Sequence, residues 1–141
     1  MPPHPATFDA AMDIRAQLRF LPVLVEFSRL FFEASLPCPV DGQLLYALQL
    51  SVSEACTNVV KHGYPPDRNA FLRLELTVNA DEVIIAVRDQ GIPFDPGTAS
   101  PPDLDNPAGH GLGVFFLRQL MDSLEYHRQG DTNLLILTKR L

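Results

Sequence analysis

The sequence is poor in cysteine and in basic residues, and it has no long hydrophobic run. Its two cysteines, Cys38 and Cys56, lack metal-ligand spacing, and Cys56 falls within a predicted helix, so we expect buried thiols rather than a disulfide. Eleven Lys and Arg against 17 Asp and Glu give a net charge of −6, which argues against a broad nucleic-acid surface. A nucleotide ligand remains compatible, because a metal ion and backbone N–H groups can bind phosphates.

The most apolar stretch, Phe20 to Phe32, is interrupted by Pro22, Glu26 and Arg29, and no segment has the length of a membrane span. The N-terminus lacks the basic segment and apolar run of a secretory signal, so we expect a cytoplasmic protein without a membrane partner. At 141 residues, with 46% hydrophobic and 20% charged residues, the composition predicts one globular domain over residues 1–141. We expect residues 1–6, which are rich in proline, to be disordered.

Hydrophobic periodicity predicts three helices and five strands. Asp41 is a candidate N-cap for the second helix, Gly63 is expected to end it in a left-handed conformation, and Pro22 marks the first turn or a kink of the first helix. The predicted helices are Ala16 to Ser35, Asp41 to His62 and Gly111 to Ser123. The predicted strands are Thr7 to Ile14, Phe71 to Asn79, Val83 to Asp89, Leu124 to Arg128 and Thr132 to Lys139.

Residues 92–110 are different, since they are rich in Pro, Asp and Gly and show no periodicity. Loops of this length in compact domains are commonly lids or binding loops, so we expect a lid here. The order of helices, hairpin, lid, helix and hairpin predicts the α+β class. We expect a two-layer α/β sandwich in which helices cover one face of a mixed, mostly antiparallel sheet.

Three polar groups follow one line of the second predicted helix. Glu54, Asn58 and His62 are spaced at i, i+4 and i+8, beside the apolar stripe. A carboxylate and a carboxamide at this border offer oxygens to a hard cation or to a hydroxyl proton. The alternative for each is a solvated side chain on a surface helix, and the pattern by itself leaves both open.

Two further motifs carry glycine. Asp89 ends an apolar strand and Gly91 follows it, an arrangement in which the carboxylate can accept from an exocyclic amine while the backbone passes close to a planar ligand. Gly109, Gly111 and Gly113 alternate directly before a helix, whose N-terminus favours anions. The alternatives are an ordinary turn and a lid hinge. The glycines match neither G-x-G-x-x-G nor a P-loop.

Taken in order, E-x-x-x-N-x-x-K-H-G, D-x-G-x-P-F-D and G-x-G-L-G resemble the N, G1 and G2 boxes of the GHKL ATPase/kinase superfamily. Within it, the segment Ser51 to Asn58 together with His62-Gly63-Tyr64 is similar to the anti-sigma-factor serine/threonine kinases. The resemblance covers Asp41 to Leu141 well and the first helix only by pattern. It implies the histidine-kinase-like ATPase fold.

The resemblance also implies roles for matching positions. Glu54 would be the general base toward an acceptor hydroxyl, and Asn58 would ligate a Mg²⁺ ion that bridges the phosphates of ATP. Asp89 would bind the adenine amino group, with Gly91 giving room for the ring. Further ATP contacts are implied for Lys61, His62, Ile92, Gly109, Gly111, Leu112, Gly113 and Thr138. Some members place an arginine immediately before the G2 glycines to contact the terminal phosphate, whereas this chain has Pro107-Ala108 there, which implies slow or partner-dependent turnover.

The leading hypothesis from this resemblance is an ATP-dependent serine/threonine kinase that acts as an anti-sigma factor. It would phosphorylate an anti-anti-sigma protein of the STAS type, sequester a sigma factor and form a homodimer, without binding nucleic acid. The alternative is a non-catalytic ATP-binding switch of the same fold. Weaker alternatives are the catalytic half of a histidine kinase and an interaction domain with degenerate boxes.

Overall fold

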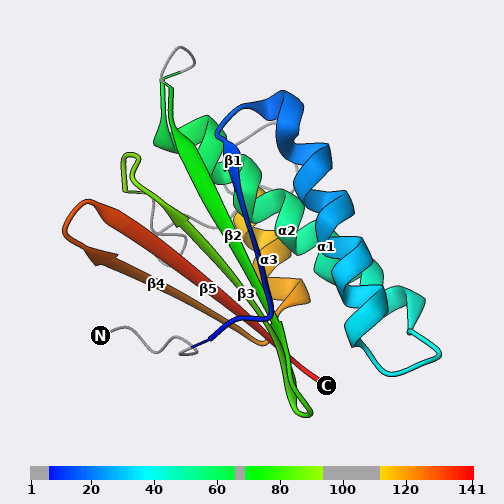
Figure 1. The fold of residues 1–141 in the computed structure, drawn as a ribbon. Helices are drawn as coiled ribbons and strands as arrows, with labels where there is room; N and C mark the ends of the chain where they lie inside the picture. Colours follow the sequence, from blue (N-terminus) through cyan, green and yellow to red (C-terminus); the bar gives the residue numbers. More distant parts are fainter. Residues whose placement is uncertain (1–6, 66–68, 94–111) are drawn as a thin grey trace.

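The computed structural model describes residues 7–65, 69–93 and 112–141. In this part of the chain one sheet carries the helices on one of its faces, as Figure 1 shows. The α+β two-layer arrangement predicted from the sequence is therefore confirmed. The strands are β1 (Ala10–Arg15), β2 (Phe71–Val78), β3 (Glu82–Asp89), β4 (Ser123–Gln129) and β5 (Thr132–Arg140). The helices are η1 (Leu18–Phe20, a 3₁₀ turn), α1 (Leu21–Ser35), α2 (Gly42–Gly63) and α3 (Leu112–Leu120).

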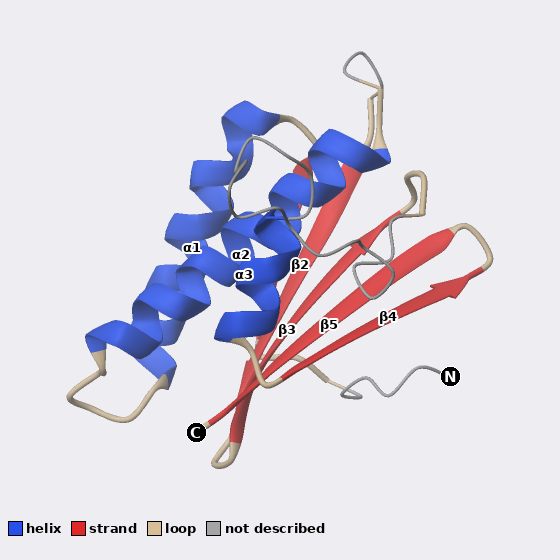
Figure 2. Ribbon diagram, turned by 180° about the vertical axis from the view of Figure 1, so that it is seen from behind, coloured by secondary structure: helices blue, strands red, loops and turns tan. Residues whose placement is uncertain are grey.

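The strand order is β1-β2-β3-β5-β4, and every pair of neighbours among the described strands is antiparallel. The expectation of a mixed sheet is therefore wrong. Two hairpins, β2–β3 and β4–β5, reverse the chain within the sheet, and the joining pair β3–β5 is antiparallel as well. Figure 2 shows the sheet from behind, with the helices on the same side of all strands.

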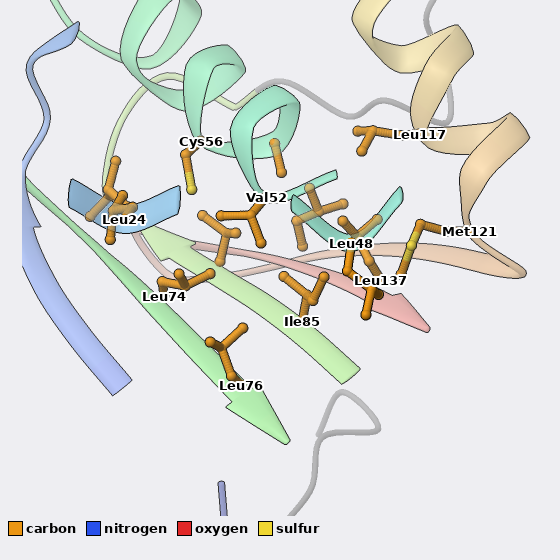
Figure 3. Packing of buried hydrophobic residues seen from close by; sticks show 14 of the residues in the cluster. Leu24, Leu48, Val52, Cys56, Leu74, Leu76, Ile85, Leu117, Met121 and Leu137 are labelled. Atoms are coloured by element: carbon orange, nitrogen blue, oxygen red, sulfur yellow. The ribbon is translucent and has the colours of Figure 1, made fainter. Parts of the chain in front are cut away.

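The core lies between the sheet and α2, which packs against α1 on one side and α3 on the other. Alternate strand residues face the helices, because side chains alternate across a strand. Leu74, Ile85 and Leu137 are fully buried there, against Leu48 and Val52 of α2 (Figure 3). Each such side chain stabilises the fold by roughly 1.5–3 kcal/mol. This core fixes α2 over the middle of the sheet.

The start of α2 agrees with the sequence prediction and its end does not. The Asp41 carboxylate caps the helix by accepting from the backbone N–H of Gln43 at 2.8 Å and of Leu44 at 3.3 Å. Gly63 is the last helical residue, and Gly130 is the one described glycine with a positive φ, so the left-handed cap expected at Gly63 is wrong. The carbonyl of Gly63 instead accepts from the backbone N–H of Ile92 at 2.8 Å.

The other boundaries differ from the predictions by a few residues. The helix expected from Ala16 is divided into η1 and α1, with Pro22 in the first turn of α1 rather than at a kink. The strand expected from Thr7 begins at Ala10, and α3 ends at Leu120 because Ser123 already pairs in the sheet. The expectations for residues 1–6 and for the lid beyond Pro93 lie outside the described residues.

Both cysteines are free thiols, in agreement with the expected absence of a disulfide. Cys56 is buried in the core, and burial raises the pKa of its thiol to about 12. Cys38 is exposed, so the expectation that it is buried is wrong. It lies in the short connection between α1 and α2, where no layer covers it. None of the helices in the described part of the chain combines the length and the apolar character needed to cross a bilayer.

Candidate active site

A pocket lies between the second half of α2 and the end of the sheet at which β3 ends and β5 begins. It encloses about 390 Å³, including the space open to solvent. Its walls are mainly apolar, with a few polar groups that converge, which is the usual composition of a small-molecule site. The lining residues are Ala55, Asn58, Val59, Gly63, Asp89, Ile92, Tyr126, Asn133 and Leu135.

The N-box side chains lie between this pocket and the first turn of α3. A Cβ atom added to Gly113 would stand 2.5 Å from Oε2 of Glu54 and 3.7 Å from Oδ1 of Asn58. A side chain at this position would meet the flexible end of Glu54, so glycine lets α3 approach α2 without displacing that carboxylate. A carboxylate beside the first turn of a helix is favoured by the helix dipole. The structure thus brings Glu54, Asn58 and Gly113 together, as the sequence motifs predict.

Asn58 carries a polar atom without a partner. Its amide nitrogen Nδ2 is buried and has no hydrogen bond within the described residues. Such a buried donor costs about 1–3 kcal/mol, and native structures contain few of them. Because Asn58 also lines the pocket, a ligand with acceptor oxygens would satisfy this donor. The residues present therefore fit a phosphate-bearing ligand.

Asp89, the last residue of β3, is 9% exposed and lines the pocket. Its Oδ1 accepts from the Gly91 backbone N–H at 2.8 Å and from Nδ2 of Asn133 at 2.9 Å, whereas Oδ2 has no described partner. Burial raises the pKa of this carboxyl group above its ordinary value, and the bonds from Asn133 and Gly91 and the charge of Arg128 act against that rise. Oδ2 is thus an acceptor for a ligand.

Gly91 has a different role from the one expected. A Cβ atom on it would stand 2.8 Å from the carbonyl carbon of Gly63 and 2.9 Å from the Gly63 Cα. The space that glycine leaves is therefore filled by the end of α2, and Gly91 does not line the pocket. Its neighbour Ile92 does line the pocket, with 64% of its surface exposed. Gly91 contributes by holding the turn against α2.

Thr138 does not line the pocket. Its expected contact with adenine is therefore wrong, and the strand register gives the reason. It pairs with Ile84 and Ser123 and lines a hollow with Ile84 and Ile136. Asn133 and Leu135 face the helices, so Thr138, an odd number of residues farther along β5, faces the opposite side. Asn133 occupies the place that the sequence reading gave to Thr138.

Lys61 and His62, expected to face the phosphates, are both exposed near the end of α2, and neither lines the pocket. Lys61 borders a separate hollow with Leu18 and Tyr64. Leu112 begins α3, and Gly109 and Gly111 lie outside the described residues. The phosphate contacts inferred for these five positions therefore stay predictions.

Sequence reasoning missed a polar group of three residues at the edge of the pocket. Asn133 pairs directly with Asp89 across β3 and β5, and its Oδ1 accepts from the hydroxyl of Tyr126 at 2.8 Å and from Nη1 of Arg128 at 2.6 Å. Both of these residues belong to β4. The signal that would have found Asn133 is its position opposite Asp89 in the register of β3 with β5, since paired residues share one face of a sheet.

The comparisons with known proteins agree with this geometry. The family model of the histidine kinase-like ATPase domain matches residues 22–139. The chain belongs to the histidine kinase-like ATPase family. This membership implies that the chain uses a nucleotide, and the pocket is lined by Asn58 and Asp89, two of the residues for which the sequence motifs predict nucleotide contacts.

Within the family, similar sequences carry names of regulatory kinases. The chain is 37% identical over 104 residues to the serine/threonine-protein kinase BtrW of Bordetella bronchiseptica, covering 70% of this chain and 72% of that protein. It is 32% identical over 100 residues to the anti-sigma F factor of Clostridium perfringens, covering 66% and 69%. It is also 32% identical over 97 residues to the serine-protein kinase RsbW of Bacillus mycoides, covering 62% and 60%.

A solved structure shows the same fold. The histidine kinase domain of the blue-light activated histidine kinase from Erythrobacter litoralis EL346 superposes with a TM-score of 0.55. The alignment covers 86% of this chain and 61% of that chain, at 20% sequence identity. The likeness therefore supports the layered arrangement of sheet and helices and carries no further argument about activity.

Proposed function

We propose that this chain is an ATP-dependent serine/threonine protein kinase that acts as an anti-sigma factor. The observation that carries the proposal is the meeting of Glu54 and Asn58 with the first turn of α3, beside a pocket that Asp89 closes. A site that only bound nucleotide would need the pocket, but it would need no carboxylate next to the phosphates. The similar proteins whose names include kinase and anti-sigma factor support the same proposal.

The adenine ring would enter the apolar part of the pocket, between Val59 of α2 and Leu135 of β5. Oδ2 of Asp89 would accept from its exocyclic amine, since Oδ1 is already used within the protein. The phosphates would then extend along α2 toward Asn58 and the N-terminus of α3, which attracts anions. Val59, Leu135, Asp89 and Asn58 all line this pocket.

Mg²⁺ fits the oxygen donors at this end of the site. Mg²⁺ is commonly held by one or two protein oxygens together with phosphate oxygens and water, so a full cage of carboxylates is not required. Oδ1 of Asn58 is such an oxygen, and the same amide places its unpaired Nδ2 donor in the pocket wall. When bound, the ion would neutralise charge on the phosphates.

Glu54 would act as the general base for the acceptor hydroxyl. As the serine or threonine oxygen bonds to the terminal phosphorus, the bond from that phosphorus to the bridging oxygen breaks and ADP leaves. Glu54 takes the hydroxyl proton, and the phosphorylated protein and ADP are the products. Such a step depends mainly on positioning and charge, and proton transfer contributes about 10²- to 10⁴-fold to the rate.

We infer two protein partners from the same relatives and motifs. The acceptor would be an anti-anti-sigma protein of the STAS type, and the protein held inactive would be a sigma factor. A kinase with these partners would work in the cytoplasm, where transcription initiates, and it would act as a homodimer. The net charge of −6 suits binding to basic faces of a sigma factor.

A non-catalytic ATP-binding switch is the second candidate. The observation that favours it is the close contact of the Glu54 carboxylate with the first turn of α3. A side chain in this place can report the position of α3, and thus of the segment before it, without taking a proton. The two candidates share the pocket and differ in whether a phosphoryl group is transferred.

One experiment separates them. The purified chain is mixed with Mg²⁺, labelled ATP and the STAS protein encoded beside it, and phosphoserine or phosphothreonine on that protein is measured. We expect transfer by the wild type and a loss of about 10²-fold or more for Glu54→Gln. Glu125→Gln, on an exposed position of β4, is the matched control and should keep the wild-type rate. Transfer at an unchanged rate by Glu54→Gln would show that Glu54 is not the base, and ATP binding without any transfer would favour the switch.

A further inference from the structure

Asn133 uses every hydrogen-bonding position of its side chain inside the protein. Its Oδ1 accepts from Tyr126 at 2.8 Å and from Arg128 at 2.6 Å, and its Nδ2 donates to Oδ1 of Asp89 at 2.9 Å and to the carbonyl of Gly91 at 3.1 Å. A carboxamide offers two donors and two acceptor positions, so none is left for a ligand. The side chain is also 2% exposed. Asn133 therefore acts by holding neighbouring protein groups in place, not by binding a ligand.

The charged neighbours fix which way this amide points. The guanidinium of Arg128 can only donate, whereas the carbonyl of Gly91 and an ionised Asp89 can only accept. Turning the amide over would place its NH₂ group against Arg128 and its oxygen against Asp89, so it would lose these bonds and add repulsion. Arg128 also donates to the Gly91 carbonyl at 3.3 Å, which ties β4 to the turn after β3.

This orientation determines what Asp89 presents to the pocket. Because Asn133 and the Gly91 N–H both bond to Oδ1, the carboxylate is held at that oxygen, and Oδ2, which has no partner among the described residues, is left as the acceptor that a ligand could use. The bond from Asn133 and the positive charge of Arg128 also lower the pKa of Asp89 against the effect of burial. Both influences favour an ionised carboxylate, which accepts hydrogen bonds and donates none.

We propose that Asn133, itself oriented by Arg128, is a positioning residue that makes the pocket select 6-amino purines over 6-oxo purines. The inference rests on the proposed function, in which a purine triphosphate occupies this pocket. A 6-amino group donates to Oδ2 of Asp89, whereas a 6-oxo group would bring an acceptor against it. A site that rejects the 6-oxo group in this manner needs an acceptor that cannot rotate away or be replaced by a donor. The hydrogen bond from Asn133 prevents the Asp89 carboxylate from rotating.

The test compares the binding of ATP and inosine triphosphate, which differ at purine position 6. Dissociation constants are measured by titration calorimetry with Mg²⁺ at neutral pH, for the wild type, Asn133→Ala and Arg128→Met. We expect Asn133→Ala to reduce the preference for ATP by about tenfold or more, the scale of one hydrogen bond to a charged group, while the affinity for inosine triphosphate changes little. Arg128→Met should shift the preference in the same direction by less, and Arg128→Lys should restore part of it.

Gln129→Met is the matched control. Gln129 follows Arg128 on β4, is exposed, and contributes nothing to the Asn133 hydrogen bonds. It should keep the wild-type preference. Equal loss of affinity for both nucleotides in Asn133→Ala would mean that Asn133 only supports the fold, and the inference would be wrong. If Asn133→Ala does not fold, Arg128→Met decides alone, since Arg128 is exposed and lies outside the core.

The same measurement distinguishes this inference from the proposed function. A wild-type chain that binds neither nucleotide overturns the proposed function, and the inference with it. A wild-type chain that prefers ATP, together with variants whose preference is unchanged, overturns the inference alone.

Discussion

Replacing Asp89 by asparagine separates the folding role of this residue from its binding role. The asparagine oxygen can keep the Oδ1 position and accept from Gly91 N–H and from Asn133, which are 2.8 and 2.9 Å away. The NH₂ group then takes the place of Oδ2, the oxygen that has no partner among the described residues and that we propose binds the ligand. An acceptor is thereby exchanged for a donor at the point where the adenine amine would bind, and the volume of the side chain is unchanged.

The expected loss of affinity follows from one hydrogen bond. A hydrogen bond to a charged group contributes about 1.5–3 kcal/mol, and each 1.4 kcal/mol is tenfold in affinity, so the dissociation constant for ATP should rise by about 10- to 150-fold. Two donors that face each other would place the result toward the upper end. Isothermal titration with Mg²⁺ and ATP measures this directly, with Glu125→Gln as the control.

The stability of the same variant should move in the other direction. Burial raises the pKa of Asp89, so the folded chain binds the proton more tightly than the unfolded chain does, and the ionised form costs stability near neutral pH. A neutral asparagine removes this cost, and the midpoint of thermal unfolding without nucleotide should be unchanged or higher. Functional groups often stabilise binding at the expense of the fold. A clearly lower midpoint, or an ATP affinity equal to that of the wild type, would refute this reasoning.

Three further predictions follow from the glycines and from Asp89. Gly91→Ala should destabilise the chain by about 1–3 kcal/mol in chemical denaturation, because its Cβ meets the backbone of Gly63, whereas Gly63→Ala, with its nearest contact at 3.7 Å, should have little effect. Gly113→Ala should keep the fold and slow phosphoryl transfer, because the added Cβ displaces the flexible end of Glu54. ATP affinity should fall on acidification at a pH above the ordinary Asp range, as Asp89 takes up a proton, and in Asp89→Asn this pH dependence should be absent. In the wild type without nucleotide, Asp89 should add stability as the pH falls through the same window.

Local chemistry was enough to predict the elements around the site. The start of α2 follows from the Asp41 cap and from an apolar stripe at helical spacing, and both hairpins follow from short turns between alternating strands. These features depend on residues that are near one another in sequence. The end of α2 depends on a partner 29 residues later, since Ile92 rather than a left-handed turn satisfies the Gly63 carbonyl. Local signals do not contain that contact.

The site was predictable where residues meet along one helix and less so where strands meet. Glu54 and Asn58 are one helical turn apart, so their proximity follows from the sequence alone. Asn133 reaches Asp89 only because β5 pairs with β3, and a shift of one residue in that register would have turned Asn133 away and Thr138 inward. The expected contact of Thr138 with adenine therefore failed on the strand face, which only the register of β3 with β5 decides.

Gly91 and Gly113 also show that a glycine near a ligand site need not serve the ligand. The sequence reading assigned the space at Gly91 to the purine ring, but that space is filled by the backbone of Gly63, and the space at Gly113 is filled by the carboxylate of Glu54. Both glycines thus let protein elements approach each other: the turn after β3 against the end of α2, and α3 against the middle of α2. Gly91 thereby places the turn after Asp89 against α2, and Gly113 places the first turn of α3 beside Glu54 and Asn58. A larger residue at either position would act on ATP by moving a wall of the site, and this is why Gly91→Ala is expected to change stability and Gly113→Ala to change the rate.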